Sequence, residues 1–133
     1  MIDIENEVFT PIAQAVRAAY SGAFVTGEYV KAPSSFPHVS IVESDNYQTL
    51  DHLDSSGEER YATIVYEVNV YSNRTSGKKT ECKGIMDLID RMMYDMNFTR
   101  TARTPVPNME DATIYRMTAR YRAETDGETI YRI

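Results

Sequence analysis

Two segments repeat apolar side chains every three or four positions, the spacing of an amphipathic helix. In the first, Val8, Ile12 and Val16 fall on one stripe, which predicts a helix from about Ile4 to Ser21. The second predicts a helix from about Lys79 to Met96. Its apolar stripe consists of Cys82, Ile85, Met86, Ile89, Met92, Met93 and Met96. We expect both stripes to pack against a shared core.

Alternation between apolar and polar positions, typical of strands, occupies much of the remaining chain. The clearest strand covers residues 60–73, and its apolar face consists of Ala62, Ile64, Tyr66, Val68 and Val70. Residues 114–123 alternate in the same way. Their polar face carries Arg116, Thr118, Arg120 and Arg122. Shorter strands are predicted at 23–30, 38–42, 98–103 and 130–133.

Turn-forming residues separate these segments. Residues 32–37 contain two prolines, and Asp126-Gly127 predicts a hairpin turn. Residues 104–108 also contain two prolines, which predict a loop because proline has no backbone N–H for a strand ladder. The order of helix, strands, helix and strands lacks repeated βαβ units. It therefore predicts one α+β domain over residues 1–133, with a mainly antiparallel sheet flanked by two amphipathic helices.

The segment 43–59 has a different character from its neighbours. It contains six acidic residues and neither Lys nor Arg, and its apolar residues follow no sustained period. The acids are Glu43, Asp45, Asp51, Asp54, Glu58 and Glu59. This composition predicts a long acidic loop that is mobile and either solvated or facing a partner.

Charge and composition exclude several classes of protein. The net charge of −6 argues against tight wrapping of nucleic acid, although DNA could pass nearby. The single cysteine excludes an intrachain disulfide. The sequence has no apolar run of about 18 residues, and its first residues are acidic, so we expect neither a membrane span nor a signal peptide.

Candidates for catalysis are weak. Glu81-Cys82-Lys83 has the Glu-x-Lys spacing of one nuclease superfamily, with Asp54 as a possible second metal ligand. That chemistry needs the pair on a strand, whereas the pattern puts it in the second helix. Asp51-His52-x-Asp54 could ligate a metal, but solvated loop residues are the favoured interpretation. We therefore expect no catalytic residue, no cofactor and no bound metal, and hence no enzyme.

Four short stretches invite comparison with a known family: Tyr71-Ser72-Asn73, Gly84-Ile85-Met86-Asp87, Ala119-Arg120-Tyr121-Arg122-Ala123 and Ile130-Tyr131-Arg132. The chain resembles the tail-terminator or tail-completion proteins of long-tailed bacteriophages in these stretches, in its length and in the order of its elements. The resemblance implies a structural protein that forms a hexameric ring. Such a ring caps the completed tail tube and joins it to the head connector, so the expected location is the virion, after assembly in the host cytoplasm.

Two alternatives remain open at this point: a head-completion adaptor at the same junction, and the small metal-dependent nuclease. For a ring, identical subunits must meet through two different surfaces. The uneven charge suggests which ones, because residues 98–133 hold six Arg against five acids. We expect Arg116, Arg120 and Arg122 on the basic side of the contact, and the acids of segment 43–59 on the other.

Overall fold

The computed structural model describes residues 1–49, 61–107 and 111–133. Its elements follow in the order α1 (Glu5–Ala19), β1 (Phe24–Thr26), β2 (His38–Gln48), β3 (Ala62–Ser72), α2 (Lys78–Asp95), β4 (Thr99–Val106), β5 (Tyr115–Thr125) and β6 (Ile130–Tyr131). The predicted α+β class is confirmed, and both helices lie close to their predicted ranges.

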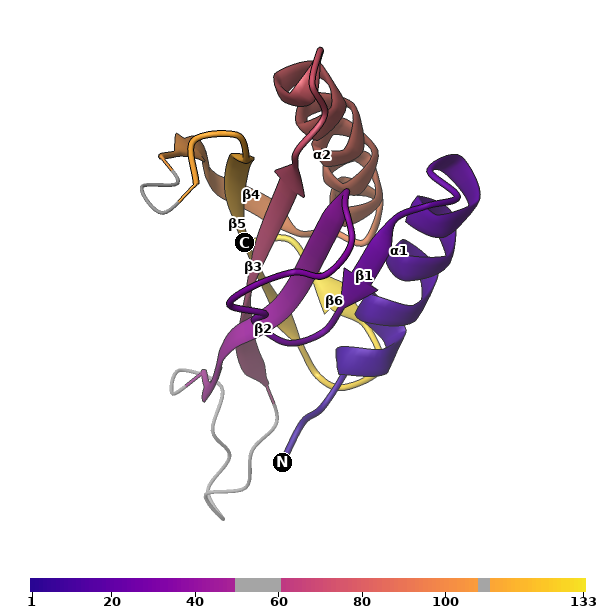
Figure 1. Cartoon of the computed structure of the whole chain (residues 1–133). Coiled ribbons are helices and arrows are strands. Elements are labelled where there is room, and N and C mark those ends of the chain that lie inside the picture. The colour runs from indigo at the N-terminus through magenta and orange to yellow at the C-terminus, as the bar shows by residue number, and fades with distance from the viewer. Residues whose placement is uncertain (50–60, 108–110) are drawn as a thin grey trace, which may run out of the picture.

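The strands form one open sheet in the order β1-β2-β3-β5-β4, with β6 pairing with β5 as well. Among the described strands, β1 and β2 run parallel and the other pairs are antiparallel. Both helices cover the same face of this sheet (Figure 1). We call that side the helix face and the opposite side the outer face.

The core lies between the helices and the helix face. The predicted stripe of α1 is buried at Val8, Ile12 and Val16, and α2 buries Ile85 and Ile89 with most of its other apolar residues. The even-numbered side chains of β3 from Ala62 to Val70 are also buried. Both stripes and the alternation of β3 are therefore confirmed as core.

The two helices approach each other closely at Gly84. A Cβ atom at this position would lie 2.8 Å from the hydroxyl oxygen of Tyr20, closer than real Cβ contacts come. The absence of a side chain at Gly84 thus gives Tyr20 the space to pack between α1 and α2.

The acidic segment begins as a strand and not as the predicted loop. Residues 43–48 continue β2 and pair with β3 as far as Gln48 and Ala62. The prediction was wrong here because main-chain pairing with β3 needs no apolar side chains, and because an irregularity between Glu43 and Asp45 interrupts the alternation. Residues 50–60 of the predicted loop lie outside the described residues.

The fourth strand is also longer than predicted. It runs through Pro105 to Val106, although prolines were expected to end it near Arg103. β4 is the last strand on its side of the sheet, and an edge strand tolerates proline because only one of its sides needs a partner.

Candidate interaction surface

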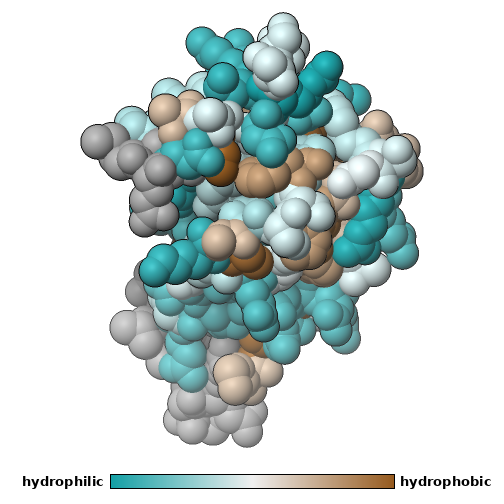
Figure 2. All heavy atoms as spheres, viewed as in Figure 1, coloured by the Kyte–Doolittle hydropathy of each residue, from teal (hydrophilic) through white to brown (hydrophobic). Residues whose placement is uncertain are grey.

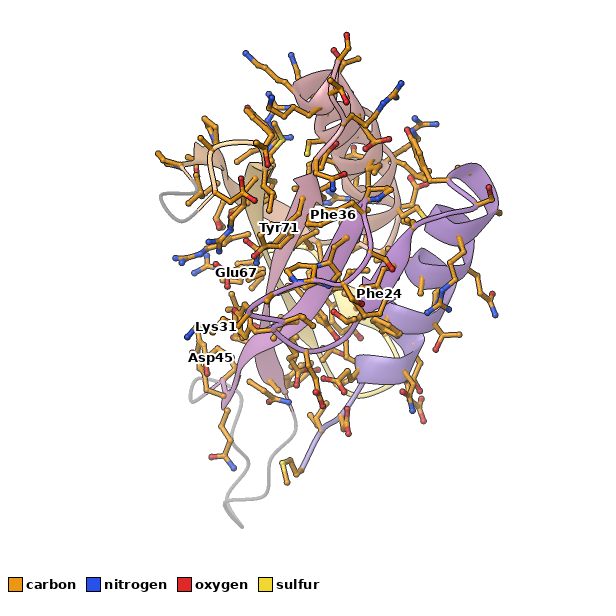
Figure 3. The ribbon with its side chains drawn as sticks, in the orientation of Figure 1. Phe24, Lys31, Phe36, Asp45, Glu67 and Tyr71 are labelled. Atoms are coloured by element: carbon orange, nitrogen blue, oxygen red, sulfur yellow. The ribbon has the colours of Figure 1, made fainter. Side chains whose placement is uncertain are left out.

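The polar face of β5 forms part of the outer face, in register with its neighbours. Three rows cross the sheet from β2 through β3 and β5 to β4. They consist of Val42, Glu67, Arg120 and Ala102; of Ser40, Asn69, Thr118 and Thr104; and of His38, Tyr71, Arg116 and Val106. Glu67 and Tyr71 are labelled in Figure 3 on the strand that bears them.

Asn69 holds two side chains of β5 in place. Its Oδ1 atom accepts hydrogen bonds from Nε and Nη2 of Arg116, at 3.0 and 2.9 Å, and from the hydroxyl of Thr118 at 2.6 Å. The guanidinium of Arg116 also lies 5.4 Å from the centre of the Tyr71 ring, within the range of a cation–π contact. Arg116 is therefore half-buried and fixed by the fold, not a freely projecting charge.

Glu67 joins the outer face to the chain segment between β1 and β2. One carboxylate oxygen lies 3.4 Å from Nη2 of Arg120, and the other accepts a hydrogen bond from the Tyr29 hydroxyl. Partial burial and this neighbouring carboxylate raise the pKa of Tyr29 to about 12, so its hydroxyl remains a donor at neutral pH. The segment that carries Tyr29 crosses in front of β2 (Figure 1).

His38 lies at the end of this face that is next to β1. It is fully buried, with its ring 5.0 Å from that of Phe24 and 5.4 Å from that of Tyr71. Its Nε2 atom lies 3.1 Å from the Thr26 hydroxyl. Burial lowers the pKa of His38, so the ring is neutral near pH 7 and acts as a packing group between two aromatic residues.

Arg116 and Arg120 of β5 border a shallow groove toward β4. It has a volume of about 330 Å³, and it is lined by Glu67, Ala102, Thr104, Val106, Arg116, Thr118 and Arg120. The side chain of Arg120 is 60% exposed despite its contact with Glu67. Arg122 is exposed as well, and within the described residues it makes no side-chain hydrogen bond or ion pair. We call Arg116, Arg120 and Arg122, with this groove, the arginine surface.

Guanidinium groups and hydroxyls suit the recognition of carboxylates or other oxyanions, because a guanidinium donates several hydrogen bonds in a fixed plane. The face of the molecule seen in Figure 2 is largely hydrophilic, with hydrophobic side chains gathered near its centre. The arginine surface can therefore bind an acidic partner through charge-assisted hydrogen bonds.

The structure places two of the six acids that the sequence grouped together on opposite faces of the sheet. Glu43 lies on the helix face, half-buried opposite Tyr66, whereas Asp45 is exposed on the outer face opposite Val65. Burial, followed by the charges of Glu5 and Asp3, raises the pKa of Glu43. The other four predicted acids, Asp51, Asp54, Glu58 and Glu59, lie outside the described residues.

A second group of acids was not singled out in the sequence. Asp3, Glu5 and Glu7 are exposed at the start of α1, and Glu28 is exposed shortly after β1. Glu5 and Glu28 line one hollow of about 390 Å³, together with Asn6, Phe9, Thr26, Gly27 and Val30. Acids are common in the first turn of a helix, so only the fold reveals that Glu28 joins them. We call these four residues the acidic patch.

Glu81, the central residue of the nuclease hypothesis, has other contacts. Glu81 lies in the first turn of α2, as predicted, where it accepts a hydrogen bond from the Ser72 hydroxyl at 2.7 Å and lies 3.7 Å from Arg74. Lys83 follows two positions later, about 200° around the helix. Asp54 lies outside the described residues. In the part of the chain that the structure describes, no three His, Cys, Asp or Glu residues gather as a metal site.

Cys82 is buried, in agreement with its predicted position on the stripe of α2. Its sulfur lies 3.6 Å from the carbonyl oxygen of Val70, and burial raises the pKa of the thiol to about 12. The thiol is therefore protonated and is a poor nucleophile at neutral pH.

Neither helix of the described chain has the length and apolar character that crossing a bilayer requires. No protein-family model matches the sequence, and no curated protein matches it either.

Proposed function

We propose that this chain is a structural protein that assembles as a ring at the head–tail junction of a long-tailed bacteriophage. The ring caps the completed tail tube and joins it to the head connector. The proposal takes its biological setting from the resemblance of the sequence to tail-terminator and tail-completion proteins. The structural observation that supports it best is the arginine surface, which lies on a face that the helices leave uncovered and in which Asn69 and Tyr71 hold Arg116 in place.

Order in the free subunit favours protein binding. A side chain that becomes fixed only on binding costs conformational entropy, which subtracts from the affinity. Arg116 avoids much of this cost because Asn69 and Tyr71 already hold its guanidinium. The strands beneath it supply a rigid support. These features suit a contact that must be repeated identically around a ring.

The charges are better suited to an acidic protein partner than to a DNA backbone. The arginines are interleaved with Glu67, and the whole chain carries a net charge of −6. Affinity for DNA depends strongly on basic residues that neutralise successive phosphates. DNA could still pass through the centre of a ring without being held by it.

A head-completion adaptor at the same junction remains the nearest alternative, since it would use similar surfaces. The two roles differ in the part of the phage particle to which the protein binds. A terminator binds the end of an isolated tail tube, whereas a head-completion adaptor binds a filled head that has no tail.

The test is the state of assembly, measured by native mass spectrometry over a range of concentrations and by negative-stain electron microscopy. A hexamer of this 15.2 kDa chain would have a mass of about 91 kDa and an annular outline. If the chain is monomeric alone, gold-labelled protein should bind one end of isolated tail tubes. A fixed dimer, or tubes without end label, would contradict the proposal.

The nuclease alternative has a separate test. Purified protein is incubated with DNA and Mg²⁺ or Mn²⁺, beside the variant Glu81→Ala. Because Glu81 is already engaged by Ser72 and Arg74, we expect no cleavage by either protein. Metal-dependent cleavage that is lost in Glu81→Ala would favour the nuclease.

A further inference from the structure

We infer that neighbouring copies of this chain meet by docking the acidic patch of one copy on the arginine surface of the next. The inference rests on the proposed ring and names the two surfaces that would close it. It uses a different acidic side from the one that the sequence suggested, of which only Glu43 and Asp45 lie within the described residues, on opposite faces of the sheet.

The arginine surface is the basic partner in this contact. Arg120 and Arg122 are exposed, and the groove beside Arg120 also offers the hydroxyl of the exposed Thr104. Glu67 neutralises Arg120 only in part, because the atoms lie 3.4 Å apart and the Arg120 side chain remains 60% exposed. The surface therefore retains an excess of positive charge on a chain that is acidic as a whole.

The acidic patch is its counterpart. Asp3, Glu5, Glu7 and Glu28 are all exposed, and none of them forms an ion pair within the described residues. Their negative charges also act on a nearby group, since Glu5 and Asp3 help to raise the pKa of Glu43. This concentration of like charge is unfavourable in the free subunit, and a basic surface would relieve it.

The positions of the two surfaces allow every copy to use both at once. The acidic patch centres on the start of α1, which lies beside β1 at one edge of the sheet, whereas the arginine surface lies on the outer face of β5 toward β4, at the other edge (Figure 1). The two surfaces come nearest at Glu28, because the neighbouring Tyr29 contacts Glu67. Two different surfaces on one subunit give a head-to-tail contact, which closes into a ring when the rotation between neighbours permits.

A charge exchange between two variants tests this contact. The first variant, Arg120→Glu/Arg122→Glu, makes both surfaces acidic. The second, Glu5→Arg/Glu28→Arg, makes both basic. Each variant alone should assemble at least about tenfold more weakly than the unmodified chain, because like charges now face each other. Mixed in equal amounts, they should assemble again with the two chains alternating, which native mass spectrometry resolves by mass.

Two single variants serve as controls. Arg91→Glu reverses an exposed charge on α2, and Glu128→Arg reverses one in the turn before β6. Both should assemble normally. Lys31 is a poorer control, because its segment crosses the outer face (Figure 3). Circular dichroism checks that every variant folds. Arg122→Glu alone is the fallback, since the Arg122 side chain makes no hydrogen bond or ion pair within the described residues.

The outcomes separate the inference from the proposed function. If the unmodified chain forms rings, in solution or on tail tubes, and either double variant does so equally well, the inference is wrong and the proposed function stands. If the mixture stops at dimers, the charge-reversed arginine surface of one variant has paired with the unchanged arginine surface of the other. Equivalent surfaces then meet each other, and the head-to-tail contact is wrong. If the unmodified chain forms a ring in neither setting, the proposed function itself fails.

Discussion

At the scale of single residues, the irregularity in β2 gives neighbouring acids different environments. It turns Asp45 to the solvent on the outer face and leaves Glu43 on the helix face, beside Tyr66. The Glu43 carboxylate is half-buried near Glu5 and Asp3, and one of its oxygens finds no hydrogen-bond partner among the described residues. An ionised carboxylate in such a place opposes folding.

The variant Glu43→Gln should therefore raise the free energy of unfolding at pH 7. Folding raises the pKa of Glu43, so its proton stabilises the fold below the unfolded value of about 4.5, and this contribution is lost as the pH rises through the folded value. We expect a gain of about 1 kcal/mol or less at pH 7, or a few degrees in Tm.

Thermal melts at pH 7 and at pH 4 measure this effect. The gain should shrink at the lower pH, where Glu43 in the original chain becomes protonated. Glu128→Gln, which changes an exposed carboxyl, should leave Tm nearly unchanged at both values. A loss of stability in Glu43→Gln at pH 7 would show that Glu43 makes a favourable contact as an anion.

At the scale of elements, α2 provides much of the core. Its residues Ile85, Met86, Ile89 and Met93 are fully buried, and it contacts β3, β4 and β5 as well as α1. Because it packs on several strands at once, a cavity beneath α2 would remove contacts with more than one element.

Ile89→Ala should lower the free energy of unfolding by roughly 2–5 kcal/mol, since it removes buried methyl groups and leaves a cavity. Denaturant unfolding followed by circular dichroism measures the change. Arg91→Ala, two positions along the same helix and exposed, should alter stability by about 0.5 kcal/mol or less. An unchanged midpoint in Ile89→Ala would mean that this stripe is not buried in the folded subunit.

The sequence predicted those elements whose buried face is marked by a local pattern of apolar side chains. The stripes of α1 and α2 and the alternation of β3 and β5 are local patterns, so their core faces could be predicted. The second half of β2 and the end of β4 could not, because pairing with a neighbouring strand extends both. Pairing depends on a partner far away in the chain.

The same distinction holds for the candidate site. Alternation along β5 was enough to place Arg116, Arg120 and Arg122 on one face. It did not reveal that Asn69 fixes Arg116 or that Glu67 lies opposite Arg120, since both follow from the register between β3 and β5. To predict the acidic patch, one would have to know that the chain after β1 returns to the start of α1.

At the scale of the whole molecule, the distribution of charge predicts how association depends on salt. Exposed charges interact over about 14 Å at 50 mM salt but over only about 4 Å at 500 mM. If the acidic patch and the arginine surface meet, the dissociation constant for assembly should rise by about tenfold or more between these concentrations.

Sedimentation velocity at both salt concentrations checks this dependence. The Tm of the separate subunit should change little over the same range, because its core is apolar. Assembly that is unaffected or strengthened by salt would indicate an apolar contact between copies.

The proline in β4 has a consequence for how far such an assembly can grow. An exposed edge strand can recruit further strands without limit, as in fibres, because each added strand presents a new edge. Pro105 deprives this edge of a donor, and the exposed Arg100 and Arg103 place charge along it. If copies of this chain associate as proposed, the β4 edge disfavours main-chain pairing and leaves the contact to side-chain surfaces, whose geometry can close. Growth into a fibre through this edge is thereby disfavoured.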